Sequence, residues 1–336
     1  MRKGIGIDLG GTNLRVALCG SGVVIAEPSM AAINRASGRV VKFGKAAEDC
    51  LDNRTPELLI TRPFKGGVVN QCEIAQKVFS WCRKRCVTSP EDTFRTFISV
   101  PCCASDVEQS ALVEVAVHAG YQQAYVVYAP LAALYGCGLD VRGGAMVVNI
   151  GASKTDIFAV HDGHCVYRHS SDAAGDMFDE AIVSYVLRKY RARLSPRSAE
   201  RVKKEIGTLW NTANRPAKYV PVLDAGDNRR TVRIGAEEMF TIFEEPTAAL
   251  MEAVCTAISS LPLDCVKSVF DTGILLLGGG AQLDGIDSMI AGVTGVRCRH
   301  VQEPELAVAR GLEKLLQSAP ENIREGCYNI GEYILK

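Results

Sequence analysis

The sequence has no excess of charge of either sign and no long apolar run. Lys plus Arg and Asp plus Glu both number 38, so the formal net charge is zero. This balance gives no global basicity of the kind that indicates binding to nucleic acid or to an anionic membrane. No stretch of 18 or more apolar residues occurs, so no transmembrane helix is expected. A strand pattern begins at Gly4, and the sequence therefore predicts no signal peptide.

Paired metal-ligand spacing is also missing, although cysteine is frequent. The 13 cysteines are an odd number and are scattered along the chain. Cys82 and Cys86 are four residues apart on a predicted helix, without a second pair at zinc-binding spacing. The pattern favours reduced, buried cysteines of a cytoplasmic protein over a metal or disulfide role.

The length and composition are those of a globular protein of two domains. The chain has 336 residues, of which 47% are hydrophobic and 23% charged, enough for two substantial cores. No low-complexity linker separates the halves, so the boundary near residues 141–143 is predicted to be a hinge.

The most informative pattern is a strand, a glycine turn and a second strand, which occurs twice. It spans Gly4–Leu18 and again Gly144–Val160, and a third glycine run, Gly278–Gly280, follows the apolar strand Ile274–Leu277. Because glycine has no Cβ, such turns let backbone N–H groups approach a phosphate. The three segments predict a nucleotide held in a cleft between two domains. An ordinary hairpin remains the alternative for the first of them.

Polar side chains accompany the first glycine turn. Asp8 ends the first strand, where a carboxylate can hold a magnesium ion, usually through water. Thr12 and Asn13 follow the glycines and can bond phosphate oxygens. In the alternative interpretation, Asp8 only caps the turn.

The remaining pattern is typical of alternating strands and helices. Ser105 is predicted to cap a helix that Gly120 ends, and Pro130 stands in the first turn of another. The other predicted elements are a β-rich block at 22–41, strands at 96–101 and 125–128, and helices at 73–85, 176–190, 198–206, 236–260 and 305–317.

Over nearly its whole length the chain resembles the MreB-like bacterial actins. These belong to the actin superfamily, together with sugar kinases and heat-shock chaperone ATPases. Besides the glycine segments, the resemblance is carried by residues 27–29, 62–63, 100–101, 106–108, 175–182, 188–190, 199–207 and 244–246.

The resemblance implies an α/β, actin-like fold of two domains, each with a ribonuclease-H-like mixed sheet and with a cleft between them. The first domain is expected at 1–142, with a small insertion at about 31–75 and a C-terminal helix at about 305–336 that packs back on it. The second is expected at 143–304, with an insertion at about 178–245.

The resemblance also implies ATP or GTP, with Mg²⁺, as cofactors. The metal would lie near Asp8. Glu200 and Lys203, on one helix face because of their i, i+3 spacing, would lie beside the adenosine. A solvated salt bridge is the alternative for that pair. The full expected nucleotide site is Gly10, Gly11, Thr12, Asn13, Gly151, Ala152, Ser153, Lys154, Thr155, Glu200, Lys203, Lys204, Gly278, Gly279, Gly280 and Ala281.

The chain departs from the family pattern where catalysis is expected. Ala129 stands where the family has a carboxylate that orients the attacking water, and Asn149 replaces an aspartate that opens the second loop. Lys154 adds a positive charge near the phosphates. Loss of a water-orienting group typically costs about 10²–10⁴ in rate. We therefore expect nucleotide binding without efficient hydrolysis, and no catalytic residue at these positions.

The function that the resemblance implies is a cytoskeletal protein that forms filaments of its own copies and contributes to cell shape. Peripheral membrane or morphogenesis proteins would be further partners, nucleic acid would not, and the location would be the cytoplasm with membrane association as an option. A degenerate scaffold or chaperone-like adaptor is the alternative. A sugar kinase is disfavoured: the opening segment is similar to that of hexokinase-like kinases, but no Asn-Asp pair occurs in the chain.

The C-terminal tail, 320–336, has an apolar face if helical, formed by Ile323, Cys327, Ile330 and Ile334. Gly326 and Gly331 weaken an isolated helix by about 1 kcal/mol each. The tail is expected to pack on the first domain, and the alternatives are folding on contact with a neighbouring subunit or membrane, or disorder.

Overall fold

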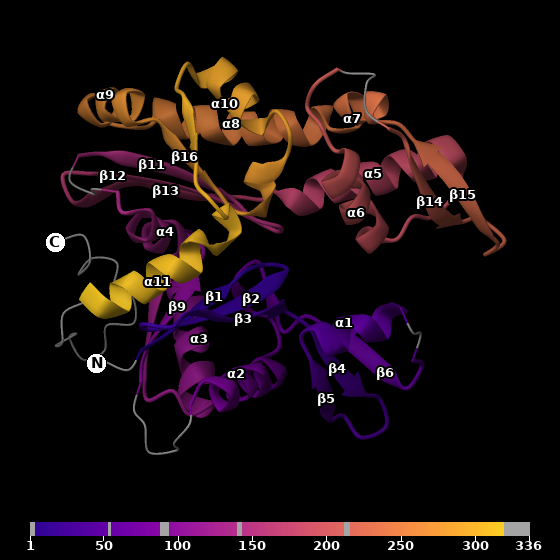
Figure 1. The fold of residues 1–336 in the computed structure, drawn as a ribbon, viewed down its shortest axis with the longest axis horizontal. Helices are drawn as coiled ribbons and strands as arrows, with labels where there is room; N and C mark the ends of the chain where they lie inside the picture. Colours follow the sequence, from indigo (N-terminus) through magenta and orange to yellow (C-terminus); the bar gives the residue numbers. More distant parts are fainter. Residues whose placement is uncertain (1–3, 53–54, 88–93, 140–142, 212–215, 319–336) are drawn as a thin grey trace. The chain divides into compact units, whose positions relative to one another are not determined.

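The chain divides into two compact units. The computed structural model describes residues 4–52, 55–87, 94–139, 143–211 and 216–318 (Figure 1). One unit comprises 1–145, 158–170 and 305–336, and the other comprises 146–157 and 171–304. The predicted C-terminal tail lies outside the described residues.

The first 145 residues contain groups of consecutive strands separated by helices (Figure 1). The elements are β1 (Gly4–Leu9), β2 (Asn13–Leu18), β3 (Gly22–Pro28), β4 (Ala31–Asn34), β5 (Val40–Phe43), α1 (Lys45–Asp52), β6 (Leu58–Thr61), β7 (Phe64–Lys65), β8 (Val68–Val69), α2 (Cys72–Cys86), β9 (Arg95–Val100), α3 (Asp106–His118), β10 (Gln123–Tyr128) and α4 (Ala129–Cys137).

The second part of the chain likewise contains groups of strands and groups of helices. Its elements are β11 (Ala145–Ile150), β12 (Thr155–His161), β13 (His164–Ser171), α5 (Gly175–Tyr190), α6 (Pro196–Ile206), β14 (Lys218–Leu223), β15 (Arg229–Ile234), α7 (Ala236–Ile242), α8 (Glu244–Ser259), α9 (Leu263–Thr272), β16 (Ile274–Leu277), the 3₁₀ turn η1 (Gly279–Gln282), α10 (Ile286–Thr294), β17 (Cys298–His300), the 3₁₀ turn η2 (Pro304–Leu306) and α11 (Ala307–Ser318).

Two five-stranded sheets have the same strand order. The first is β3-β2-β1-β9-β10, in which β1 pairs antiparallel with β2 and parallel with β9. The second is β13-β12-β11-β16-β17, in which β11 pairs parallel with β16 and β16 with β17. Numbered by appearance, both sheets therefore have the order 3-2-1-4-5. The predicted α/β fold with two sheets of related topology is confirmed.

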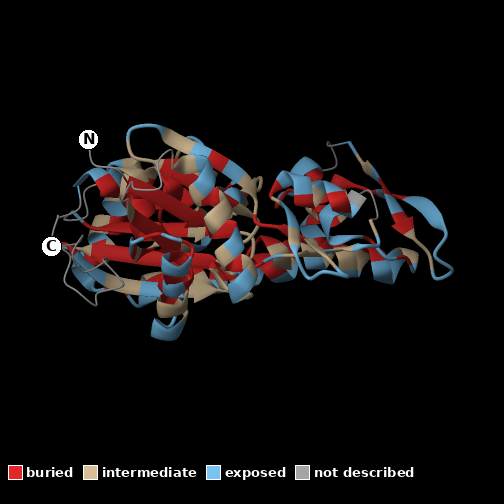
Figure 2. Ribbon diagram, turned by 90° about the horizontal axis from the view of Figure 1, so that it is seen from below, coloured by how far each residue is buried: buried red, intermediate tan, exposed pale blue. Residues whose placement is uncertain are grey.

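The last described helix, α11, packs against α4 and β1, far back in the sequence (Figure 1). Every residue of β1 is buried, and buried residues gather in the central strands (Figure 2). A Cβ at Gly6 would lie 2.7 Å from Cβ of Leu312, so only glycine lets the helix approach the strand so closely. Between α11 and α4 the fit is closer still. A Cβ at Gly311 would lie 1.7 Å from the carbonyl oxygen of Ala132, and one at Gly136 would lie 2.5 Å from that of Ala307.

Helix boundaries follow the capping residues of the sequence. The Ser105 hydroxyl accepts from the Glu108 N–H, and the Glu108 carboxylate accepts from the Ser105 N–H at 2.8 Å, which completes the predicted N-cap of α3. Gly120 follows this helix with φ +95° and ends it, as predicted.

One predicted helix is wrong. Residues 236–260 form two helices, α7 and α8, which meet at Phe243. Phe243 has φ −92° and ψ 2°, outside the helical region, and Pro246 stands in the first turn of α8. Because proline lacks an N–H, it is tolerated there but not within a continuous helix.

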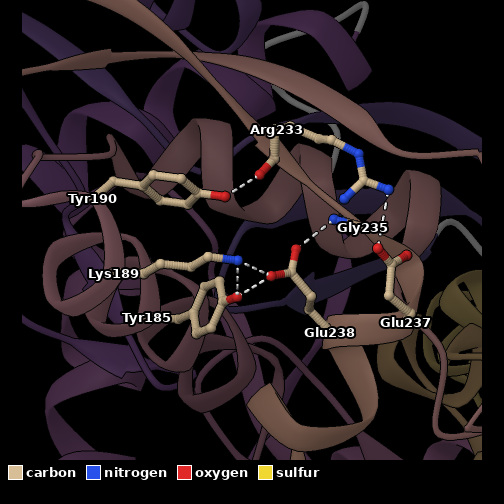
Figure 3. A network of polar contacts seen from close by, with 7 residues as sticks. All are labelled: Tyr185, Lys189, Tyr190, Arg233, Gly235, Glu237 and Glu238. Atoms are coloured by element: carbon tan, nitrogen blue, oxygen red, sulfur yellow. Dashed lines mark hydrogen bonds and ion pairs between the residues drawn. The ribbon is translucent and has the colours of Figure 1, made fainter.

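A polar network ties α5 to α7 and β15 in the second unit (Figure 3). Lys189 and Tyr185 of α5 both contact the Glu238 carboxylate, which also accepts from the Gly235 N–H at 2.7 Å. The hydroxyl of Tyr190 donates to the carbonyl of Arg233. These contacts join α5 to strand β15 of the two-stranded sheet β14-β15 and to α7.

Three further observations concern only the described residues. The cysteines there are free thiols. No three side chains of His, Cys, Asp or Glu gather into a metal-binding group. None of the helices there has both the length and the apolar character that crossing a membrane requires.

Candidate nucleotide-binding site

The first glycine turn joins β1 to β2 and has no room for a side chain at its start. A Cβ at Gly10 would lie 2.7 Å from the carbonyl oxygen of Asn13. The carbonyl of Thr12 accepts from the Ser29 N–H at 2.8 Å, which fixes the turn to the segment after β3. Residues 10–13 are half-buried. The turn is thus rigidly placed, with partly accessible backbone.

The second turn, between β11 and β12, repeats this geometry. A Cβ at Gly151 would lie 2.8 Å from the carbonyl oxygen of Lys154, and the Gly151 N–H donates to the same oxygen at 2.9 Å. The carbonyls of Gly151 and Ala152 accept from the N–H groups of Gly175 and Asp176, at 3.1 and 2.7 Å. These bonds hold the turn against the first residues of α5.

The third glycine run lies against the end of β11, directly before the second turn. Gly278 has φ +79°, and a Cβ there would lie 2.3 Å from the carbonyl oxygen of Ile150. A Cβ at Gly280 would lie 2.3 Å from Cγ2 of Ile150. Gly279, in contrast, has nothing within 4 Å of that position. Two of the three glycines therefore serve close packing, and only Gly279 leaves space for a ligand. Ala281 is buried in η1.

Lys203 of α6 reaches the first residues of α5, which are hydrogen-bonded to the second turn. Its ammonium donates to the carbonyl of Gly175 and to Oδ2 of Asp179, both at 2.8 Å, and its side chain is 16% exposed. The half-buried Glu200 accepts from the exposed Lys204 at 2.6 Å. The structure thus brings Lys203 to the glycine segments and pairs Lys204 with Glu200.

Lys154 and Thr155, at the end of the second turn, have partners within the second unit. The Lys154 ammonium lies 2.6 Å from Oδ1 of Asp172, and 37% of its side chain is exposed. The Thr155 hydroxyl donates to the carbonyl of Ala173 at 2.7 Å. Thr155 therefore has a structural role, whereas the Lys154 charge stays partly accessible beside the turn.

Asp8, in the first unit, has two neighbours that were not predicted from the sequence, Ser99 and Arg15. The Ser99 hydroxyl donates to Oδ1 of Asp8 at 3.0 Å and accepts from the Leu9 N–H, also at 3.0 Å. Nη1 of Arg15 lies 3.5 Å from Oδ2. Burial raises the pKa of the Asp8 carboxyl, and Arg15 and Ser99 act against that rise. The hairpin register pairs Asp8 with Arg15. It would therefore have indicated Arg15, but not Ser99, as a neighbour of Asp8.

This arrangement does not fit a magnesium ion bound directly by Asp8. One carboxylate oxygen has a hydroxyl donor and the other a guanidinium. A dication placed about 4 Å from the guanidinium would be repelled by on the order of 8 kcal/mol at an effective dielectric constant of about 20.

The two positions expected to hold carboxylates also have defined surroundings. Ala129 is the first residue of α4 and is only 8% exposed. Asn149 is half-buried near the end of β11, next to the third glycine run. A methyl group cannot polarise water, and an amide carries no charge. Neither residue can act as a general base.

The family is shown by comparison with known proteins. The family model described as MreB/Mbl protein matches residues 2–324. The chain belongs to this family. It is 31% identical over 327 residues to the cell shape-determining protein MreB of Escherichia coli K12, covering 93% of each chain. It is also 31% identical over 320 residues to the cell shape-determining protein Mbl of Bacillus cereus, covering 94% of this chain and 96% of that protein.

Solved structures of similar proteins confirm the actin-like fold. MreB5 of Spiroplasma citri bound to ADP has a TM-score of 0.89 at 24% identity, with 95% of this chain and 97% of that chain covered. A chain of the MamK double helical filament has a TM-score of 0.80 at 21% identity, with 95% and 100% covered. The predicted relation to MreB-like bacterial actins is therefore confirmed for family and fold.

One prediction arises from Asp179, beside the site. Burial raises the pKa of its carboxyl from 3.8 to about 6, although the nearby Lys203 acts against this. As the pH falls from 7.5 to 5, the folded state takes up a proton here and the unfolded state does not. This group therefore stabilises the fold as the pH falls. The free energy of unfolding of Asp179→Asn minus that of the wild type should therefore decrease by roughly 1–2 kcal/mol as the pH falls from 7.5 to 5. Urea denaturation of both proteins at pH 7.5 and at pH 5 measures this difference. The same difference at both pH values would contradict the raised pKa of Asp179.

Proposed function

We propose that the protein is a cytoskeletal actin homologue that binds ATP or GTP and assembles into filaments that contribute to cell shape. The observation that carries the proposal is the pair of glycine turns with matching backbone geometry on two sheets of the same strand order. Family membership supports the cell-shape role, and the ADP and filament forms of MreB5 and MamK support nucleotide binding and self-assembly.

In this proposal the domains are those predicted from the sequence, 1–142 and 143–304, and both glycine turns face the phosphates. Lys154 and Lys203 supply positive charge in the second unit, and Gly279 gives the ligand room. The Arg15–Asp8 pair excludes magnesium from direct contact with Asp8, so any metal that accompanies the phosphates would be held through water.

The protein is further proposed to act in the cytoplasm. Other copies of the chain are its main partners, with peripheral membrane or morphogenesis proteins as additional ones. A scaffold that binds nucleotide without hydrolysing it is the second candidate, favoured by Ala129 and Asn149. Both candidates have the same nucleotide site, and they differ in whether the bound nucleotide is hydrolysed.

Nucleotide binding and assembly are tested together with one substitution. Gly279→Val has space in the fold, because nothing lies within 4 Å of its Cβ position, and it fills the space left for the ligand. It should weaken ATP binding at least about tenfold, or about 1.4 kcal/mol. The matched control is Gly292→Ala in α10, where a Cβ also meets nothing. Calorimetry measures binding, and electron microscopy with and without ATP and magnesium measures assembly.

Two results would contradict the proposal. Wild-type protein that binds neither ATP nor GTP at millimolar concentration has no nucleotide site. Wild-type protein that binds nucleotide but gives no filaments or light scattering at tens of micromolar, on lipid or in solution, is an adaptor and not a filament subunit.

A further inference from the structure

Arg15 occupies a place next to the first glycine turn that is unusual for so large a charged side chain. It lies on β2 opposite Asp8, and both side chains are largely withdrawn from solvent, with 14% and 8% exposed. Nη1 is 3.5 Å from Oδ2 of Asp8 and 3.5 Å from the position that a Cβ at Gly10 would take. The guanidinium end therefore lies at the turn itself.

The guanidinium has capacity for a further partner. It carries five N–H donors in a planar fork, and within the described part of the chain its hydrogen bond is the one from Nη1 to Asp8. The same fork matches a phosphate group with two parallel hydrogen bonds. Because Asp8 balances its charge, Arg15 can be buried there without a bound ligand.

We propose that Arg15 is the cation that contacts the nucleotide phosphates at the first glycine turn, in place of a metal ion bound by Asp8. Asp8 then serves as a positioning residue that holds the guanidinium at the turn. This inference rests on the proposed nucleotide site. Its consequence is that nucleotide binding depends little on divalent metal, because the charge that offsets the phosphates is covalently part of the chain.

The test compares the Kd for ATP in excess magnesium and in excess EDTA, by calorimetry on the full chain. Wild type should show less than about a threefold difference. Arg15→Leu should bind at least about tenfold more weakly in EDTA, and magnesium should restore part of that loss. Arg229→Leu, the same change at an exposed position of β15, is the matched control and should leave both constants unchanged.

A second variant covers the case in which Arg15→Leu does not fold, since it leaves Asp8 buried without its partner. The double variant Asp8→Asn with Arg15→Leu removes both charges and should show the same loss in EDTA. The inference is overturned if wild type needs magnesium for binding, or if either variant binds in EDTA as wild type does. Absence of binding in both conditions is a different result, which contradicts the proposed function itself.

Discussion

A double variant, Ala129→Glu with Asn149→Asp, is expected to hydrolyse ATP at least about tenfold faster than the wild-type chain, since a positioned general base contributes about 10²–10⁴ in rate. The reason is chemical, because the wild-type side chains at these places are a methyl group and an amide. Residue 129 begins α4, and a carboxylate is favoured there by the positive end of the helix dipole. Phosphate release under saturating ATP measures the rate.

The control for this experiment keeps the size of the new side chains and removes their charge. Ala129→Gln alone should leave hydrolysis at the wild-type rate, since an amide does not accept the proton. Equal turnover in wild type and in the double variant would show that these two positions do not limit the chemistry, and it would remove the distinction between filament ATPase and inert scaffold.

Substitution of Gly311 by alanine should unfold or severely destabilise the first unit. The added Cβ would lie 1.7 Å from the carbonyl oxygen of Ala132, so α11 and α4 would have to separate. Overpacking against a backbone that cannot yield is expected to cost about 3 kcal/mol or more. Thermal and urea denaturation followed by circular dichroism measure the loss.

The matched control is again a helical glycine. Gly292→Ala in α10 adds the same methyl group where nothing lies within 4 Å, and it should raise stability by about 0.5–1 kcal/mol through helix propensity. If Gly311→Ala is as stable as wild type, then α11 does not pack on α4 as closely as described.

Much of the fold could be predicted because its signals are local. The strand, glycine turn and strand pattern gave β1–β2 and β11–β12, and Ser105 and Gly120 gave the two ends of α3. The break at Phe243 was missed, because both flanking helices continue the apolar pattern and the only local signal is Pro246, three residues later. The expectation of a mixed sheet in each domain came from the family resemblance and not from periodicity.

The candidate site was predicted less completely, because side-chain partners across strands leave no local signal. Gly278 and Gly280 were predicted as places of ligand approach, yet they accommodate the end of β11. The ion pair of Lys203 with Asp179 joins residues 24 positions apart, on two helices. The contact of Arg15 with Asp8 is the one that could have been predicted, because the register of a short hairpin places the two residues opposite each other.

The packing of α11 on β1 and α4 has a consequence during synthesis. The first unit needs a helix that begins at Ala307, whereas its first continuous segment ends at residue 145. At about 5–20 residues per second, the ribosome takes roughly 8–30 seconds to make the intervening stretch. Throughout that time the strand faces that α11 covers have no partner. The emerging chain therefore exposes these apolar strand faces until its end is made, and a product that terminates before Ala307 lacks the helix that covers them.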